Sequence, residues 1–484
     1  MIHPKIVLHV VAIFILILSG FLLVPLAVSL IYNELECTRS FAYTIIGSAA
    51  IAGLVFFVTV KKRNTKMSFK DSFLLVVLSW ITASLVGALP FVLSGGIPSY
   101  TDAFFETMSG FTTTGASILT EIDSLPKSLL FWRSLTHWLG GMGIVVLTVA
   151  VLPLLGIAGV QLVQAESPGP SMEKIYPKIT GMAKLLWTIY LGLTVLETVL
   201  LMFGGMDLFN ALTHTFGTLA TGGFSPQNTS VGHFDSAYID VVITIFMLAA
   251  GLNFAIYYRV FLGKFSEIKK NTEMKAYLAI FVIATVLTCI PLVGSVYPDL
   301  WQSLRFSGFQ VASILTTTGY ATADFDTWPG FSKFVLFALM FIGGSAGSTG
   351  GGIKVIRIVT IFKQSIIELK YLIFPRKVFK VHINKGPVRK DFIYTVFGFV
   401  FLYFLMLMIT TGVVASGGYE ILTSFTTALA TVGNIGPGFD LIGPAQNYAF
   451  FPGYIKWFLS LAMMVGRLEV YTVLVIFTGF FWKR

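Results

Sequence analysis

Long apolar runs follow one another from the first residues of the chain to the last, with only short polar stretches between them. The run from Ile6 to Tyr32, for example, contains no Asp, Glu, Lys or Arg. A helix needs about 20 mainly apolar residues to cross the hydrocarbon core of a bilayer. Only 12% of the 484 residues are charged, against about 25% in soluble domains. These features predict a polytopic all-α membrane protein and exclude ordinary soluble folds.

The apolar runs are long enough for ten transmembrane helices, which would place both termini on the same side of the membrane. The expected spans are residues 6–32, 41–60, 71–94, 129–163, 183–204, 236–262, 276–294, 331–363, 391–416 and 454–482. Basic clusters such as Lys61-Lys62-Arg63 and the stretch from Lys354 to Lys390 lie in connections on one side. Because Lys and Arg concentrate on the cytoplasmic side, we expect that side and both termini to be cytoplasmic. The net charge of +10 then needs no nucleic-acid partner.

Four semi-polar segments remain in the extracellular connections, at about 101–120, 206–226, 299–322 and 419–438. Each reads as an amphipathic half-helix followed by a Thr/Gly-rich stretch. We expect them to be re-entrant, with acidic residues at the half-helix starts: Asp102, Asp207, Asp299 and Glu420. Irregular backbone at membrane depth is tolerated only where it is buried in protein or lines a water-filled cavity. Function is therefore expected at these segments.

The four segments end in similar motifs that recur roughly 100 residues apart. The motifs are Phe111-Thr112-Thr113-Thr114-Gly115-Ala116, Leu219-Ala220-Thr221-Gly222-Gly223-Phe224, Leu315-Thr316-Thr317-Thr318-Gly319-Tyr320 and Gly433-Asn434-Ile435-Gly436-Pro437-Gly438. One such motif alone would more often be an ordinary surface turn. Four equivalent loops around an axis could instead ring a pore with carbonyl oxygens that replace the hydration shell of a monovalent cation. Glycine suits this position because it reaches positive φ without strain.

These motifs predict two leading helices followed by four parallel repeats, each a span, a re-entrant loop and a second span, around a central pore. The predicted boundaries are 1–66 for the leading helices and 67–180, 181–272, 273–390 and 391–484 for the repeats. Inverted repeats, typical of alternating-access symporters, need an odd number of spans per repeat. Parallel repeats favour a channel-like path, although coupling of K⁺ transport to Na⁺ or H⁺ stays open.

With these motifs the chain resembles the Trk/Ktr/HKT superfamily of potassium transporters over essentially its whole length, and most closely the bacterial TrkH type, which likewise adds two helices before four repeats. The resemblance implies one selectivity glycine per repeat, at Gly115, Gly222, Gly319 and Gly436. Relatives that admit Na⁺ often have Ser at the first position, so Gly115 favours K⁺. The fourth motif departs from the Thr-rich pattern, which predicts an asymmetric ring. The full set of expected K⁺-binding residues is Thr112, Thr113, Thr114, Gly115, Ala220, Thr221, Gly222, Thr317, Thr318, Gly319, Asn434, Ile435 and Gly436.

A second irregular stretch, with six glycines between Gly343 and Gly352, interrupts the eighth apolar run. A continuous helix is not expected there, because each Gly costs about 1 kcal/mol relative to Ala. The stretch is not a phosphate-binding loop, because Ile353 stands where that motif requires Lys. A small-residue helix interface is one interpretation. The other, which the resemblance also implies, is a mobile gate formed by Gly343, Gly344, Gly347, Gly350, Gly351, Gly352, Lys354 and Arg467.

Arg467 lies inside the last apolar run, where a charge costs about 3 kcal/mol. We expect it near the pore as a barrier to resting cation leak, with an ion pair to another helix as the alternative. Glu469, two positions later, is expected to face elsewhere. Glu197 is expected to be a buried residue with an ion-pair or hydrogen-bond partner that the sequence does not identify.

The resemblance also implies the partners and the location. It implies a homodimer with one pore per subunit, seated in a bacterial inner membrane on a cytoplasmic ring of nucleotide-binding regulatory subunits of the TrkA type. The basic connection from Phe362 to Asp391 could contact that ring or lipid headgroups. No cofactor is expected, since K⁺ is the transported ion. A membrane-embedded enzyme is disfavoured, because the six His residues show no metal-ligand spacing.

Overall fold

The computed structural model describes residues 2–59, 67–143, 179–384 and 386–483. This part of the chain is almost entirely helical. The strands β1 (His382–Ile383) and β2 (Gly386–Pro387) form a short antiparallel hairpin. The all-α architecture expected from the apolar runs is therefore confirmed.

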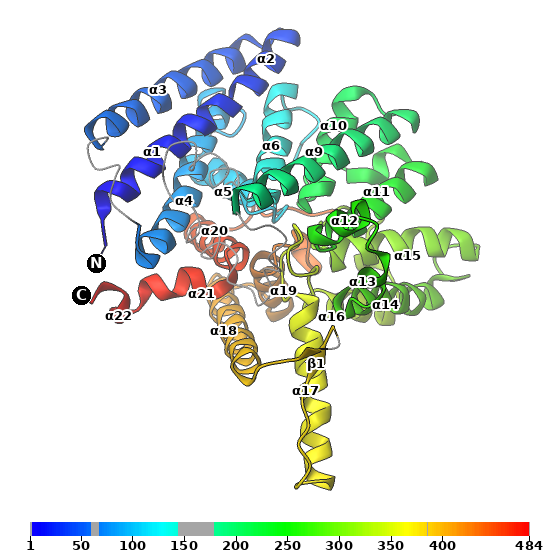
Figure 1. The fold of residues 1–484 in the computed structure, drawn as a ribbon. Coiled ribbons are helices and arrows are strands. Elements are labelled where there is room, and N and C mark those ends of the chain that lie inside the picture. Colours follow the sequence, from blue (N-terminus) through cyan, green and yellow to red (C-terminus); the bar gives the residue numbers. More distant parts are fainter. Residues whose placement is uncertain (1, 60–66, 144–178, 385, 484) are drawn as a thin grey trace.

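The chain opens with two long helical spans that pack side by side along one flank (Figure 1). The first combines α1 (Pro4–Phe21) and α2 (Leu23–Ile31), and the second is α3 (Leu35–Thr59). Hydroxyl groups join them inside the apolar interface, where Ser19 and Ser48 share a 2.8 Å hydrogen bond. These are the two leading helices that the sequence predicts.

The remaining helices follow one pattern four times: a long helix, a short half-helix and a further helix. The long helices are α4 (Phe69–Leu93), α9 (Ile179–Phe203), α14 (Thr272–Cys289) and α18 (Lys390–Ala415). The half-helices are α5 (Tyr100–Phe111), α10 (Leu208–Ala220), α15 (Leu300–Leu315) and α19 (Ile421–Val432). In Figure 1 the four groups succeed one another around the centre in chain order, from cyan through green and yellow to red. The re-entrant character of the four predicted segments is thus confirmed.

The closing helix of each repeat is shorter or broken. These helices are α6 (Lys127–Gly141), the pair α11 (Ala237–Ala250) and α12 (Phe254–Phe261), the pair α16 (Gly330–Leu339) and α17 (Val355–Ile373), and the series α20 (Gly453–Arg467), α21 (Glu469–Leu474) and α22 (Gly479–Trp482). The short helix α13 (Phe265–Lys269) connects the second and third repeats. Short 3₁₀ turns complete the helical structure at Ser230–Phe234, Ile290–Leu292, Phe325–Thr327, Asp440–Ile442 and Val475–Phe477.

The expectation of ten continuous spans is wrong in detail. Among the described residues six helices are long and apolar enough to cross a membrane, or eight if each bent pair counts as one span. The predicted span 236–262 bends by 95° between α11 and α12, and 454–482 bends by 113° after Arg467. The predicted span 331–363 is interrupted between α16 and α17, and the part of 129–163 from residue 144 on lies outside the described residues. Apolar composition does not report such bends.

Local residues explain both bends. The side chain of Asn253 accepts a 2.8 Å hydrogen bond from the backbone N–H of Ala255, which starts α12 in a new direction. At the second bend, Glu469 has a left-handed backbone with φ 53°. A continuous α-helix cannot contain a left-handed residue, so α20 ends before it.

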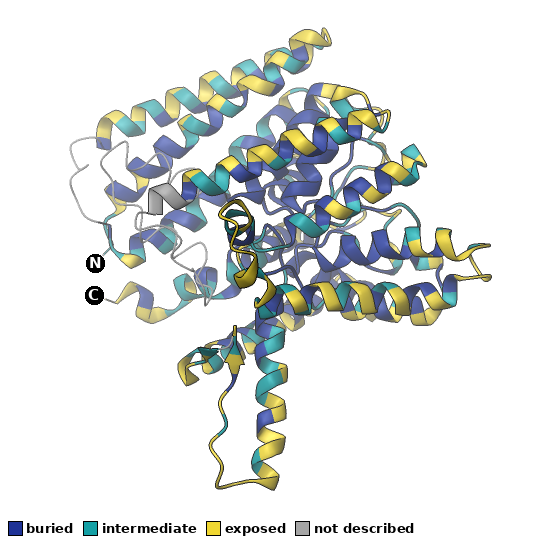
Figure 2. Ribbon diagram, turned by 45° about the vertical axis from the view of Figure 1, so that its right-hand side comes forward, coloured by how far each residue is buried: buried dark blue, intermediate teal, exposed yellow. Residues whose placement is uncertain are grey.

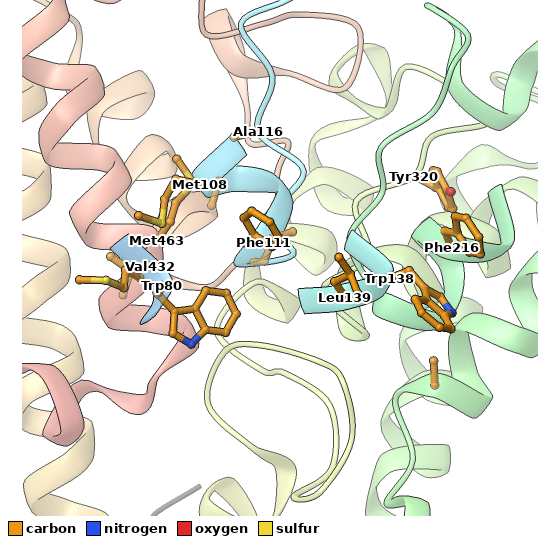
Figure 3. Packing of buried hydrophobic residues seen from close by; sticks show 14 of the residues in the cluster. Trp80, Met108, Phe111, Ala116, Trp138, Leu139, Phe216, Tyr320, Val432 and Met463 are labelled. Carbon is orange, nitrogen blue, oxygen red and sulfur yellow. The ribbon is translucent and has the colours of Figure 1, made fainter. Parts of the chain in front are cut away.

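Buried residues occupy the centre of the fold, and exposed residues lie on outer helix faces (Figure 2). The exposed residues include large apolar ones such as Phe57 and Phe203. An apolar outer surface is what contact with lipid tails requires. Figure 3 shows the core around the inner ends of the half-helices. Its labelled residues are Trp80, Met108, Phe111, Ala116, Trp138, Leu139, Phe216, Tyr320, Val432 and Met463. The chain is a membrane protein whose four half-helices end inside this core.

Candidate functional site

The half-helices begin with carboxyl or hydroxyl groups that cap free backbone N–H groups. Asp207 accepts from the N–H of Asn210, Asp299 from that of Gln302, and Ser99 from that of Asp102. Glu420 occupies the same place in the fourth repeat without a side-chain cap. Acidic side chains near the start of a helix are stabilised by the positive end of its dipole. The opposite, negative end of each half-helix points to one of the four loops in the core.

The four loops share one backbone conformation. In each, two residues separated by a single residue have positive φ. The pairs are Thr113 (52°) and Gly115 (81°), Thr221 (53°) and Gly223 (78°), Thr317 (60°) and Gly319 (81°), and Asn434 (53°) and Gly436 (95°). We refer to residues 112–115, 220–223, 316–319 and 433–436 as the first to fourth filter loops.

This conformation corrects the alignment of the second loop by one residue. Gly223, with φ 78°, is the equivalent of Gly115, whereas Gly222 occupies the place of Thr114. The sequence offers two adjacent glycines there, and the Thr/Gly pattern alone does not say which of them is left-handed. Gly222 still belongs to the loop, where its carbonyl oxygen faces Gly115.

The four loops meet in chain order and close a ring. A Cβ atom added at Gly115 would lie less than 3.0 Å from the carbonyl oxygen of Gly222. The same test places Gly223 against the oxygen of Thr318, and Gly319 against that of Ile435. Finally, Gly436 of the fourth loop lies against the oxygen of Thr114 in the first, at 2.7 Å.

Each glycine of the ring therefore lies against a main-chain oxygen of the next repeat. The space between them is too small for any side chain. The carbonyl oxygens involved come from the middle residue of each pair, which is the same structural position in all four loops. The predicted gathering of the loops around one centre is observed.

Hydrogen bonds of the filter-loop side chains join residues within a loop, neighbouring loops and flanking helices. Thr112 and Thr114 share a 2.8 Å hydrogen bond, and Thr316 and Thr318 share one of 2.7 Å. In the fourth loop the amide nitrogen of Asn434 donates to the hydroxyl oxygen of Thr114 and to the carbonyl oxygen of Met463, both at 2.9 Å. Asn434, which stands where the other three loops have Thr, thus links the fourth loop to the first by a hydrogen bond.

The Gly-rich stretch forms a closed loop, residues 340–354, between α16 and α17, which we call the gate loop. Its two ends pair: the N–H of Gly343 donates to the oxygen of Ile353 at 2.9 Å, and the N–H of Val355 donates to that of Gly344 at 3.2 Å. The two sides of the loop approach each other so closely near its ends that a Cβ at Gly343 would collide with Gly351. Glycine is therefore required for this fold of the chain.

Gly350 and Gly351, on the C-terminal side of the gate loop, lie against two filter loops. The N–H of Gly351 donates a 2.7 Å hydrogen bond to the hydroxyl oxygen of Thr317. A Cβ at Gly351 would lie 2.5 Å from the carbonyl oxygen of Gly433, and one at Gly350 would lie 3.0 Å from that of Thr316. The gate loop therefore abuts the ends of the half-helices α15 and α19.

The bend between α11 and α12 holds the other side of the gate loop. The last carbonyl groups of a helix have no partner within it. Here the oxygen of Gly251 accepts from the N–H of Ser345 at 2.8 Å, and that of Ala250 accepts from the N–H of Thr349 at 3.3 Å. In return, the N–H of Phe254 donates to the oxygen of Gly347 at 3.0 Å. The broken helix is a backbone cradle for the gate loop.

Glu273, at the start of α14, joins the middle of the gate loop to the first turn of α17. Its oxygen Oε1 accepts from the N–H of Ala346 at 2.8 Å and from the N–H of Ile356 at 3.1 Å. The ammonium group of Lys354 donates to the oxygen of Gly350 within the loop. Sequence reasoning missed Glu273, because nothing in the sequence links it to a segment more than 70 residues away.

Arg467 connects the gate loop to the first repeat. It donates to the oxygen of Thr349 at 2.6 Å and to the oxygens of Gly140 and Gly141 at 2.7 and 3.0 Å. Its predicted nearness to the gate loop is observed. It is, however, the last residue of α20 and not an interior residue of a continuous span. The negative end of the helix dipole stabilises a positive charge at this position.

Two acids of the membrane region have different surroundings. Glu469 forms a partly buried ion pair with Arg357 of α17, so it does face away from Arg467 as expected. Glu197 of α9 is fully buried, and within the described residues neither of its carboxylate oxygens has a hydrogen-bond partner. Thr218 of α10 is the polar side chain that interacts with this carboxyl group.

Comparison with known proteins agrees with this geometry. A family model described as TrkH, cation transport protein, matches residues 38–484. The Trk system potassium uptake protein TrkH of Escherichia coli K12 is 38% identical over 486 residues and covers 100% of both chains. TrkH of Halomonas elongata is 39% identical and covers 99% of both chains.

A solved structure supports the same assignment. The crystal structure of the potassium transporter TrkH from Vibrio parahaemolyticus matches with a TM-score of 0.89 and 34% identity, over 100% of both chains. The resemblance inferred from the sequence motifs is confirmed, and the chain belongs to the TrkH family of cation transport proteins.

Proposed function

We propose that this protein takes up K⁺ across the bacterial inner membrane by channel-like permeation through the four filter loops. The observation that carries the proposal is the closed ring in which each loop's glycine contacts a carbonyl oxygen of the next loop. Main-chain oxygens arranged in this way can replace the hydration shell of K⁺. Transport, and not enzymatic chemistry, is also the activity of the TrkH family.

Electrostatics of the half-helices favour a cation at the ring. Four negative helix ends converge on the loops, and each is equivalent to roughly half an elementary charge. At the opposite ends, Asp102 is neutralised by Lys456 at 2.6 Å, whereas Asp207 and Asp299 cap exposed helix starts. Acidic groups at a pore mouth raise the local concentration of cations. Cations would thus be attracted first to the mouth and then to the ring.

The gate loop is proposed to block the path on one side of the ring at rest. Its contacts with Thr317 and Gly433 place backbone across the ends of two half-helices. Arg467 adds a positive charge beside this backbone. Release of the loop would remove both the steric and the electrostatic barrier. Residues Gly343 to Gly352 supply the backbone freedom that such a movement requires.

We also propose a homodimer that docks on a cytoplasmic ring of nucleotide-binding subunits of the TrkA type, with both termini in the cytoplasm. The two termini lie near one another in Figure 1, and the ammonium group of Lys70 donates to the carbonyl oxygen of Lys483. Helix α17 and the β1–β2 hairpin project from the body of the fold (Figure 2). Exposed residues of α17 and of its connection to β1 include the apolar Leu372 and Val378 and the basic Lys377. This arm suits a protein partner or lipid headgroups.

Purified protein in K⁺-loaded liposomes provides the test. We expect uptake of radioactive rubidium down its electrochemical gradient, with external K⁺ competing more strongly than external Na⁺. Absence of any cation movement, even with the regulatory subunit added, would refute the proposal. Uptake that depends on an imposed Na⁺ or H⁺ gradient would instead establish coupled symport.

A further inference from the structure

One position recurs in all four half-helices, and in three of them its side chain bonds to the chain that leaves the following filter loop. It lies seven residues before the first left-handed residue of that loop, and its side chains are Glu106, His214, Gln310 and Thr427. We call residues 116–118, 224–226, 320–323 and 437–439 the exit segments. The four side chains differ in charge and hydrogen-bonding capacity, so the four exit segments are held in different ways.

In three repeats this position bonds to the exit segment. Glu106 accepts from the hydroxyl of Ser117 and from the N–H of Ile118, both at 2.9 Å. His214 shares a 3.0 Å hydrogen bond between Nε2 and the hydroxyl of Ser225. The side-chain oxygen of Gln310 accepts from the N–H of Thr322 at 2.9 Å when its amide is oriented to satisfy its neighbours. The half-helix therefore fixes where the chain goes after each of these loops.

The first repeat adds a partner that reaches the second. Arg133 of α6 lies 2.6 Å from Glu106, between Nε and Oε1, and the two side chains are 3% and 0% exposed. The same guanidinium group donates to the carbonyl oxygen of Ser225 at 2.8 Å. It also stacks on the ring of Phe224, with 3.6 Å between its central carbon and the ring centre. Arg133 thus joins the exit segments of the first and second loops.

The two anchored residues lie close to the ring itself. Ser117 and Ser225 each follow the left-handed glycine of their loop by two residues. A guanidinium group is planar and presents its donors in a fixed fork, so it sets the separation of the groups that it binds. A carbonyl ring distinguishes K⁺ from Na⁺ through the placement and number of its oxygens. The spacing of the first two loops is therefore a property on which selectivity depends.

We propose that the buried Glu106–Arg133 pair is a positioning pair that holds the first and second filter loops at a fixed separation and thereby sets the K⁺ over Na⁺ selectivity of the ring. The inference rests on the proposed function. It assigns the pair a role beyond stability, although neither residue belongs to the filter loops. Neither residue bonds to the gate loop among the described contacts, so we expect the pair to set selectivity and not resting flux.

Arg133→Lys is the sharpest test, because it keeps the positive charge but replaces the fork by a single ammonium group that cannot serve both Glu106 and Ser225 in the same geometry. Glu106→Asp is the second variant, since it keeps the negative charge but shortens the reach to Ile118. For each folded variant we expect the ratio of K⁺ to Na⁺ uptake in liposomes to fall by about tenfold, equal to about 1.4 kcal/mol of discrimination.

Arg305→Lys is the matched control. Arg305 forms a similar pair, with its Nε 2.7 Å from the Oδ2 of Asp240, but it joins α15 to α11 and bonds to no exit segment among the described residues. We expect this variant to keep the wild-type uptake ratio. An altered ratio in Arg305→Lys equal to that in Arg133→Lys would overturn the assignment to the filter.

Folding is followed by size-exclusion chromatography and thermal unfolding of the same samples. Folded variants at positions 106 and 133 with a wild-type uptake ratio would overturn the inference, and so would failure of both to fold, because the pair would then serve stability alone. The wild-type protein separates the two proposals. A wild type that moves no cation refutes the proposed function, whereas a selective wild type with unaltered variants refutes only the positioning role.

Discussion

The backbone N–H of Gly351 and the side-chain hydroxyl of Thr317 form a 2.7 Å hydrogen bond that joins the gate loop to the third filter loop. Thr113 occupies the equivalent place in the first loop, with the same left-handed backbone. Within the described residues its hydroxyl has no hydrogen-bond partner. Thr221 of the second loop has the same backbone conformation, so three repeats carry this side chain in this conformation. Among the described residues, only the hydroxyl of Thr317 bonds to the gate loop.

Thr317→Val removes the acceptor and keeps the shape of the side chain. We expect higher resting rubidium uptake in liposomes and a loss of about 1 kcal/mol of stability, since an N–H group loses its partner. The control is Thr113→Val, which removes a hydroxyl that contacts no part of the gate loop. Equal changes in resting uptake for the two variants would show that the bond from Gly351 does not hold the gate loop.

Arg467→Gln removes the positive charge and shortens the side chain that joins the gate loop to Gly140 and Gly141. We expect resting uptake of rubidium to rise about tenfold, which corresponds to a barrier lowered by about 1.4 kcal/mol. Arg467→Lys keeps the charge but cannot reproduce the three contacts, so an intermediate uptake is expected. Unchanged or reduced uptake by folded Arg467→Gln protein would contradict a barrier role.

Gly115→Ser places a side chain against the carbonyl oxygen of Gly222 at a position with φ 81°. We expect the ratio of K⁺ to Na⁺ uptake to fall, because the displaced oxygen belongs to the ring. The backbone strain of a non-glycine residue at positive φ costs about 1–3 kcal/mol by itself. Gly95→Ser is the control for that strain, since Gly95 has φ 75° and nothing within 4 Å of its added Cβ. A lowered ratio in both variants would exclude local crowding as the cause.

Glu273→Ala removes the acceptor shared by Ala346 and Ile356. Each N–H left without a partner costs about 1–3 kcal/mol, so we expect a lower thermal unfolding midpoint together with higher resting uptake. Asp391→Ala is the comparison, because the Arg389–Asp391 pair is exposed and such pairs contribute about 0–1 kcal/mol. A lower midpoint with unaltered uptake would limit Glu273 to a role in stability.

Much of the architecture follows from the sequence because a bilayer permits few solutions. Apolar length identifies the long helices, and the Thr/Gly-rich segments between them can enter the membrane only where protein or water surrounds them. The half-helices and their loops were therefore predictable. So was the interruption after Leu339, because the run from Gly343 to Gly352 disfavours a helix.

The remaining features depend on contacts between distant residues or on ambiguous local signals. Two adjacent glycines hide the register of the second loop, which only the positive φ of Gly223 resolves. Asn253 inside an apolar run was the available signal for the bend before α12, since Asn is a common helix cap. No local pattern reveals that Arg133 meets Ser225 or that Glu273 meets Ala346. These contacts arise only after the repeats assemble.

The ring has a consequence for how such a protein can change over evolutionary time. Each filter glycine lies against an oxygen contributed by the following repeat, and the fourth lies against the first. A substitution at Gly319, for instance, acts on Ile435 of the next loop as well as on its own backbone. Compensating mutations for a filter change should therefore arise in the neighbouring repeat. We therefore expect substitutions in the four filter loops to be correlated between loops that are neighbours in the ring.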